Sequence, residues 1–98
     1  MSRITFVSRM TVKAGREAEF VGLCKELTAV VREKEPDILW FDFFKLREQN
    51  RYCVVESFAA EADEHHHMST PHLAHYGPKI ADCVEGTWVR EYLDPFEV

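Results

Sequence analysis

The histidines of this 98-residue chain are concentrated in one stretch, where they could transfer protons. Residues 56–72 hold four of the five histidines and several carboxylates. The stretch joins the end of a predicted strand to the starts of two predicted helices. Imidazole changes charge near neutral pH and is often a general acid or base. We therefore expect the functional site here.

His72 has a position suited to a base. It follows Pro71 in the first turn of a predicted helix, where the positive end of the helix dipole favours the neutral imidazole. A neutral ring can accept a proton from a substrate. The alternative is structural, because His67 and His72 could instead cap and pack the turn between the two helices through hydrogen bonds.

Glu56 shares the apolar face of its predicted strand with residues such as Val54 and Phe58. A carboxyl group in that setting is costly unless it is paired or protonated, and such a group can mark a functional site. The alternative is a structural carboxylate that is hydrogen-bonded to His67, His72 or a backbone amide.

The histidine spacing argues against a metal site. His65, His66 and His67 would point about 100° apart around a helix, so they cannot all converge on one ion. His72 and His75 could share a helical face, but surface positions are the default for His65 and His66. The sequence also has no CxxC, HExxH, GxGxxG or P-loop pattern, and it predicts no metal and no other cofactor.

The same stretch resembles the antibiotic biosynthesis monooxygenase (ABM) family of small dimeric α+β barrel proteins. In that family a Glu-Ser-aromatic strand end leads into a short helix, a histidine and a Ser/Thr-Pro-His turn. The corresponding residues of this chain are Glu56, Ser57, Phe58, His67, Thr70, Pro71 and His72. The order of predicted elements fits along essentially all of the chain, so residues 1–98 read as a single ABM-like domain.

The resemblance implies a cofactor-independent monooxygenase that acts on a quinol or another phenolic small molecule and on oxygen. In such family members a protein base deprotonates the substrate, and the anion reduces oxygen directly in a dry cavity. His67 and His72 fall at the family's histidine positions and are the catalytic candidates, together with Glu56. An aromatic-lined cavity would suit a planar substrate. The candidate substrate contacts are Trp40, Phe58 and Tyr76.

Two other functions stay open. Relatives that process a phosphorylated quorum-sensing signal share the Thr-Pro-His turn, and the same His/Glu set could move a proton between carbons in an isomerase. That function needs a phosphate-binding group, for which Arg9, Arg51 and Arg90 are only isolated candidates. The other is a non-catalytic small-molecule-binding module. Haem is disfavoured by comparison with the related haem-degrading branch, which pairs a first-strand Asn with a helix Trp and a later axial histidine. Here the first strand has no Asn and Gly77 falls near the axial position, although His75 is close enough to take that role in a shifted alignment.

The strands and helices predict an α+β, ferredoxin-like split βαββαβ fold with an antiparallel sheet. Pro36 should stop the first helix, and Thr70 should cap the third, with Pro71 in its first turn. Gly77 and Pro78 should break or kink this last helix. Strands are predicted over residues 4–12, 38–46, 52–58 and 88–93, and helices over 20–31, over 59–68 and from 71 onward.

A sheet with its helices on one face leaves its other face uncovered. We expect that face to carry several apolar side chains, and an exposed patch of that extent usually marks an interface. A homodimer with two sheets packed face to face, as the resemblance implies, would cover it. The side chains expected there are drawn from Val7, Phe41, Phe43, Val55, Trp88 and Tyr92.

Composition limits the partners. The net charge of −5 and the lack of a Lys/Arg cluster argue against nucleic acid. There is neither an apolar run of about 20 residues nor a signal-peptide pattern, so we expect no membrane partner and a cytoplasmic protein. Cys24, Cys53 and Cys83 lie in apolar patterns at wide spacings and are expected to be buried free thiols.

Overall fold

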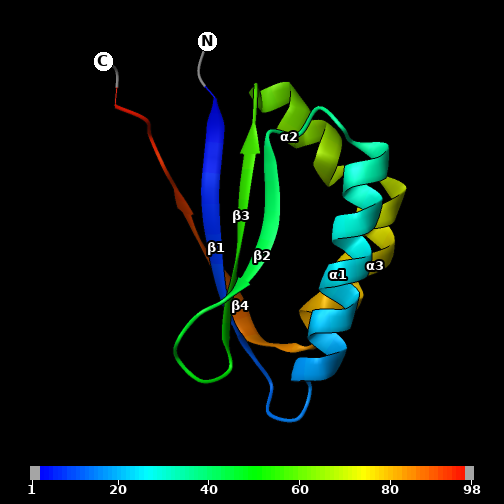
Figure 1. The fold of residues 1–98 in the computed structure, drawn as a ribbon, viewed down its shortest axis with the longest axis vertical. Helices are drawn as coiled ribbons and strands as arrows, with labels where there is room; N and C mark the ends of the chain where they lie inside the picture. The colour runs from blue at the N-terminus through cyan, green and yellow to red at the C-terminus, as the bar shows by residue number, and fades with distance from the viewer. Residues whose placement is uncertain (1–2, 97–98) are drawn as a thin grey trace.

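The computed structural model describes residues 3–96 and contains a four-stranded antiparallel sheet with three helices on one of its faces (Figure 1). The strand order is β2-β3-β1-β4. This is the predicted ferredoxin-like α+β fold. The elements are β1 (Ile4–Val12), α1 (Glu17–Lys34), β2 (Trp40–Lys45), β3 (Arg51–Phe58), α2 (Glu61–Met68), α3 (Pro71–Asp82) and β4 (Val84–Tyr92).

The last strand begins earlier than its apolar residues suggest. β4 starts at Val84, and its pairing with β1 changes register between Arg9 and Thr11. Gly86 lies near this irregularity with a φ of 66°. A bulge interrupts the alternation of apolar and polar side chains along a strand. The hydrophobic pattern therefore did not reveal the part of β4 that precedes residue 88.

The helices follow their apolar stripes and caps. The buried residues of α1 are Phe20, Cys24, Leu27 and Val31, which recur at helical spacing. The Thr70 side chain accepts a hydrogen bond from the Leu73 backbone N–H at 3.4 Å, so the predicted cap of α3 is present.

Of the break or kink predicted at Gly77 and Pro78, the break is absent: α3 continues through Pro78 to Asp82. Pro78 has no N–H to donate to the carbonyl of Ala74. Ala74 is exposed, so water can satisfy that carbonyl instead. Beyond the proline, Ile80 and Cys83 are buried, and their packing holds the end of the helix on the sheet.

The aromatic side chains of β2 divide between the faces in the opposite way to the expectation. Phe41 is buried, and Phe43 packs edge-on against Phe20 of α1 with ring centroids 6.3 Å apart, so both face the helices. Trp40 and Phe44 alternate with them on the open face, where they are 46% and 44% exposed. Hydrophobicity cannot decide the orientation of a strand whose two faces are both aromatic.

Two aromatic residues of β4 also face the helices instead of the open side. Tyr92 pairs with Phe6 and packs edge-on against it at 5.4 Å, and Trp88 packs against the buried core. Val7 and Val55 pair with each other on the open face, as expected. The open face therefore carries fewer aromatic rings than predicted, but it remains apolar through Trp40 and Phe44.

The helices of residues 3–96 are short or amphipathic, and none of them has the length and apolar character needed to cross a membrane. The cysteines are Cys24, Cys53 and Cys83, all buried and free, as predicted.

Candidate functional site

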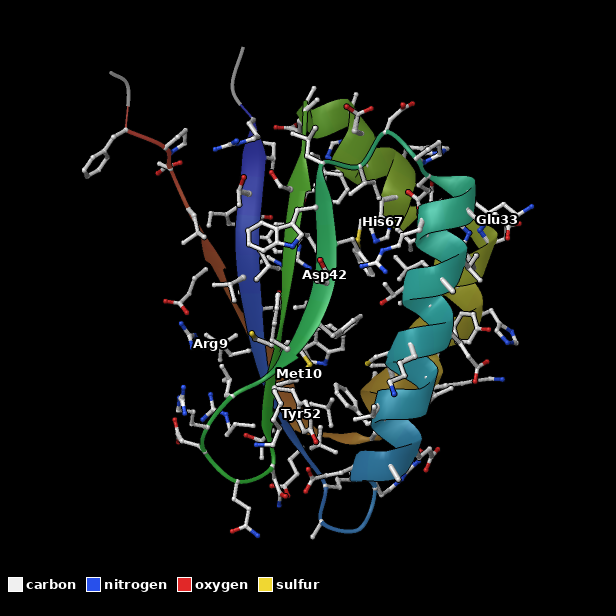
Figure 2. All side chains as sticks on the ribbon, viewed as in Figure 1. Arg9, Met10, Glu33, Asp42, Tyr52 and His67 are labelled. Atoms are coloured by element: carbon white, nitrogen blue, oxygen red, sulfur yellow. The ribbon has the colours of Figure 1, made fainter. Side chains whose placement is uncertain are left out.

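Four ionisable side chains meet between the helices and the sheet, each from a different element. They are Glu35 directly after α1, Glu56 of β3, His67 of α2 and His72 of α3. Figure 2 shows His67 on the inner side of the helices, facing the sheet. The three predicted catalytic residues thus lie near one another, and Glu35 joins them as a member that the sequence analysis missed.

Glu35 bridges the two histidines. Its carboxylate oxygens lie 3.1 and 2.9 Å from Nδ1 of His67, and Oε2 lies 2.5 Å from Nε2 of His72. A carboxylate can only accept hydrogen bonds, so each of these ring nitrogens must donate its hydrogen. His72 is thereby left with Nδ1 as its proton acceptor, and His67 with Nε2.

The end of α1 places Glu35 at this point. Its backbone N–H donates to the carbonyl of Val31 at 2.8 Å, and Pro36 then ends the helix. The buried stripe Phe20, Cys24, Leu27 and Val31 continues at the same spacing to residue 35, which faces inward. That spacing could have revealed Glu35, but its charged neighbours made the segment look solvent-exposed.

His67 is enclosed by aromatic rings. It is 1% exposed, and its ring centroid lies 5.3 Å from that of Phe41 and 5.6 Å from that of Phe58. Its Nε2 lies 3.5 Å from Oε1 of Glu56, close enough for electrostatic interaction. The dry surroundings strengthen every charge interaction that the ring makes.

Glu56 is buried without a hydrogen-bond partner for Oε1. Burial raises the pKa of its carboxyl to about 7, and the nearby negative charges of Glu64 and Glu35 add to the increase while Arg90 opposes it. A protonated Glu56 could donate its hydrogen to Nε2 of His67. The four residues then form one chain, from His72 through Glu35 and His67 to Glu56.

Two cavities reach this chain from different sides. A cavity of about 450 Å³ is lined by His72, Glu35, Thr70 and Lys34. A second, of about 270 Å³, is lined by Glu35 and Trp40 among others. Glu35 lines both cavities, whereas His67 lines neither.

The predicted substrate contacts are scattered. Trp40 lines the cavity beside Glu35, and its Nε1–H donates to Asp42 at 2.9 Å. Phe58 is fully buried between Phe6 and His67. The hydroxyl of Tyr76 donates to Glu26 of α1 at 3.1 Å. Among these three, only Trp40 lies at one of the two cavities described above.

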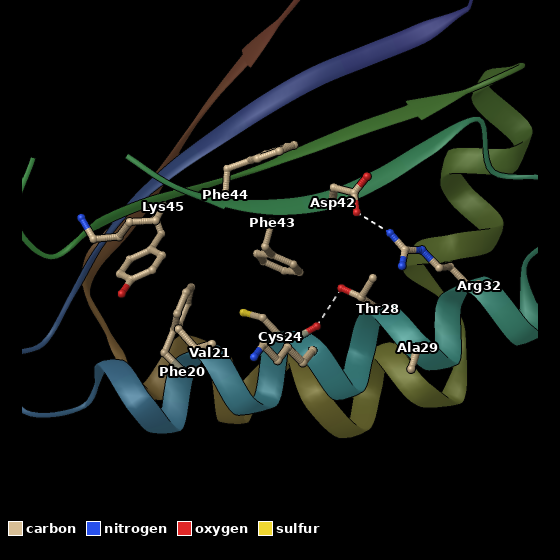
Figure 3. A pocket seen from close by; sticks show the side chains of 12 residues that line it. Phe20, Val21, Cys24, Thr28, Ala29, Arg32, Asp42, Phe43, Phe44 and Lys45 are labelled. Atoms are coloured by element: carbon tan, nitrogen blue, oxygen red, sulfur yellow. Dashed lines mark hydrogen bonds and ion pairs between the residues drawn. The ribbon is translucent and has the colours of Figure 1, made fainter. Parts of the chain in front are cut away.

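A third cavity, of about 380 Å³, lies between α1 and β2 (Figure 3). Its apolar wall includes Phe20, Phe43 and Tyr52, and the ion pair of Arg32 with Asp42 borders it. The same ion pair borders the 270 Å³ cavity, so the two cavities adjoin along the edge formed by α1 and β2. Together they extend toward Glu35. This cavity was not predicted from the sequence.

The arginines proposed as phosphate contacts do not converge. Arg90 lies on the helix side of the sheet, where it stacks on Phe6 at 4.0 Å and lies 3.6 Å from Glu64. Arg9 lies on the open face and donates to Glu91 at 2.8 Å. Arg9 and Arg90 are therefore each paired with a carboxylate on their own side of the sheet, whereas Nε of Arg51 on β3 is buried without a hydrogen-bond partner within residues 3–96.

Comparison with known proteins identifies the family. The model of the antibiotic biosynthesis monooxygenase family matches residues 3–78. The chain belongs to this family. Comparison with curated proteins gave no match.

Solved ABM-like structures share the whole fold. A Caulobacter crescentus protein, provisionally described as an antibiotic biosynthesis monooxygenase, is 29% identical with a TM-score of 0.91, and the match covers 98% of this chain and 92% of that one. A Bacteroides thetaiotaomicron protein with the same provisional description is 26% identical, with a TM-score of 0.81 and coverages of 99% and 90%. SnoaB of Streptomyces nogalater, a cofactor-independent oxygenase solved as a mutant, is 16% identical, with a TM-score of 0.80 and coverages of 100% and 97%.

Proposed function

We propose that this ABM-family protein is a monooxygenase that oxidises a quinol or another phenolic small molecule with oxygen and without a metal, flavin or haem. The observation that carries the proposal is the buried chain of His72, Glu35, His67 and Glu56 beside two cavities. Proton removal from a phenol is the step that such a chain can perform. The described function of SnoaB supports a cofactor-independent oxygenase on this fold.

His72 is the proposed base. Its side chain is 12% exposed and lines a cavity, whereas that of His67 is 2% exposed. With Nε2–H donated to Glu35, the lone pair of Nδ1 can take the phenolic proton. The adjacent Glu35 carboxylate stabilises the positive charge that the ring acquires, as the acidic member of a catalytic triad does.

Oxygen then reacts with the phenolate. The anion of a hydroquinone transfers one electron to oxygen, and the resulting radical and superoxide combine through a new carbon–oxygen bond. The protonated His72 returns its proton to the peroxide, and loss of water then gives a hydroxyquinone. One hydroquinone and one oxygen thus yield one hydroxyquinone and one water. A dry site suits this sequence because it limits the escape of the radical pair.

The test is oxygen uptake with a panel of benzene and naphthalene hydroquinones, in the presence of a chelator. We expect His72→Ala to lower the turnover rate by about 10²- to 10⁴-fold, the usual contribution of a general base. His65→Ala is the matched control, because His65 is exposed on α2 and lies away from the chain. Full activity of His72→Ala, or equal losses in both variants, would contradict the assignment.

The same assay addresses the other two functions. An isomerase would convert its substrate without oxygen uptake, and a binding module would retain a ligand without turnover. Arg9 and Arg90 do not favour a phosphate-binding isomerase, since they are paired with carboxylates on opposite faces of the sheet.

A further inference from the structure

We infer that Glu35, His67 and His72 form a binding site for one divalent transition-metal ion, of which Zn²⁺ is the representative. One ligand atom from each residue can be chosen so that all three lie within 4.8 Å of one another. A tetrahedral zinc ion keeps its ligand atoms about 3.3 Å apart. The distances of 2.9 Å and 2.5 Å from Glu35 to the two rings must lengthen by less than about 1 Å to reach that spacing. The two ring nitrogens lie within 4.8 Å of each other and would move closer together on binding.

The donor set has the composition of known metal sites. Two imidazoles and one carboxylate bind zinc in several hydrolases and leave a fourth position open for water. The same set with open positions also binds iron(II). The sequence-based expectation of no metal rested on the histidines alone, without Glu35. The different directions of His65, His66 and His67 around α2 do not affect the site formed by Glu35, His67 and His72.

Glu56 supplies the outer contact that metal-bound histidines usually have. If an ion bound Nδ1 of His67, the ring hydrogen of this histidine would be on Nε2. This nitrogen lies 3.5 Å from Oε1 of Glu56. That oxygen is buried without a hydrogen-bond partner, so it has room for this hydrogen bond. A carboxylate behind a histidine orients the ring and strengthens its bond to the metal.

The local charges also suit a divalent cation. Glu35 and Glu56 are 8% and 6% exposed, and the rings of Phe41 and Phe58 flank the histidine between them. A buried carboxylate such as Glu35 needs compensating positive charge in this apolar enclosure, and a bound cation would supply it.

An ion can reach this position from outside. His72 and Glu35 line the 450 Å³ cavity, which is also bordered by Thr70 and Pro71. Lys34 is the one lysine or arginine that lines this cavity among the described residues, and its side chain is 63% exposed, so it can turn toward solvent. The fourth coordination position would face this cavity and hold water.

Occupation of the site would block the proposed base, and this consequence alone rests on the proposed function. The ion would bind Nε2 of His72 and remove Glu35 as the partner that stabilises the protonated ring. Zinc would therefore inhibit phenol oxidation instead of supporting it.

Isothermal titration of the chelator-treated protein with Zn²⁺ tests the binding without any activity assay, and the visible spectrum of added Co²⁺ reports the coordination number. We expect about one ion per chain. Glu35→Gln, which preserves shape, and His72→Ala should each weaken binding by at least about 100-fold, and Glu56→Gln by about 10-fold. His65→Ala and His75→Ala are the matched controls and should change it less than about twofold.

Three results would overturn the inference: no saturable binding, affinity unchanged in Glu35→Gln and His72→Ala, or affinity lost in His65→Ala. The last would show that exposed histidines collect the ion. Thermal melts confirm that each variant is folded. If zinc binds as expected but the protein oxidises no phenol, the metal site stands and the proposed function fails.

Discussion

Glu56 shows how burial changes the chemistry of a single residue. The carboxyl is enclosed by the sheet and α2, and burial raises its pKa from an ordinary 4.5 to about 7. A proton on Glu56 is therefore favoured more strongly in the folded than in the unfolded chain. The folded state loses this advantage as the pH rises through that range, because the unfolded chain releases the proton first.

The pH dependence of stability should reveal this residue in chelator-treated protein. We expect the free energy of unfolding to fall by about 1–3 kcal/mol between pH 4.5 and 7 through Glu56, and to be independent of this group above that range. Glu56→Gln should remove this part of the decrease. Urea unfolding of both proteins at several pH values measures the difference. Parallel curves for the two proteins would mean that Glu56 does not titrate in this range.

At the scale of elements, Glu35 connects three helices. It lies at the end of α1 and contacts one histidine of α2 and one of α3. The backbones of α1 and α2 have little direct contact, so this carboxylate supplies a polar link that apolar packing does not. Removal of one partner from a buried charged group is costly because the remaining groups lose their compensation.

Replacement of Glu35 by Ala should therefore lower the free energy of unfolding by about 3 kcal/mol. Glu33→Ala is the matched control, since Glu33 lies on the outer side of α1 (Figure 2) with a side chain that is 74% exposed. That change should stay within about 0.5 kcal/mol of the wild type. Urea unfolding at neutral pH measures both. Equal effects of the two substitutions would show that the bridge contributes no stability.

The sequence was sufficient for the topology and only partly sufficient for the site. Alternation predicted β1 with its observed ends, and Thr70 and Pro71 predicted the start of α3, because these signals are local. The resemblance brought His67, His72 and Glu56 into one region. Glu35 was missed because its charged neighbours hid its place on the buried stripe of α1, and because its partners His67 and His72 lie 32 and 37 positions further along the chain.

At the scale of the molecule, the open face of the sheet is the face that none of the three helices covers (Figure 1). Trp40 and Phe44 are 46% and 44% exposed there, and Val89 and Leu93 of the β4 end are 59% and 48% exposed. Exposed apolar side chains at both edges of one sheet face are of the kind that marks an interface. The helices already cover the opposite face, so a second copy packed sheet to sheet is the arrangement we expect.

We predict a homodimer at micromolar concentration that buries on the order of 2,000 Å² or more. Val55→Arg places a charge on the open face, where burial without a partner would cost several kcal/mol, so this variant should be monomeric. Met68→Arg is the matched control, because Met68 of α2 is 53% exposed on the helical side of the molecule. Light scattering coupled to size-exclusion chromatography measures the mass of each protein. If the wild type is a monomer, or if both variants dissociate to the same extent, the open face is not the interface. If only Val55→Arg loses the dimer, the apolar side chains of this face form the subunit contact.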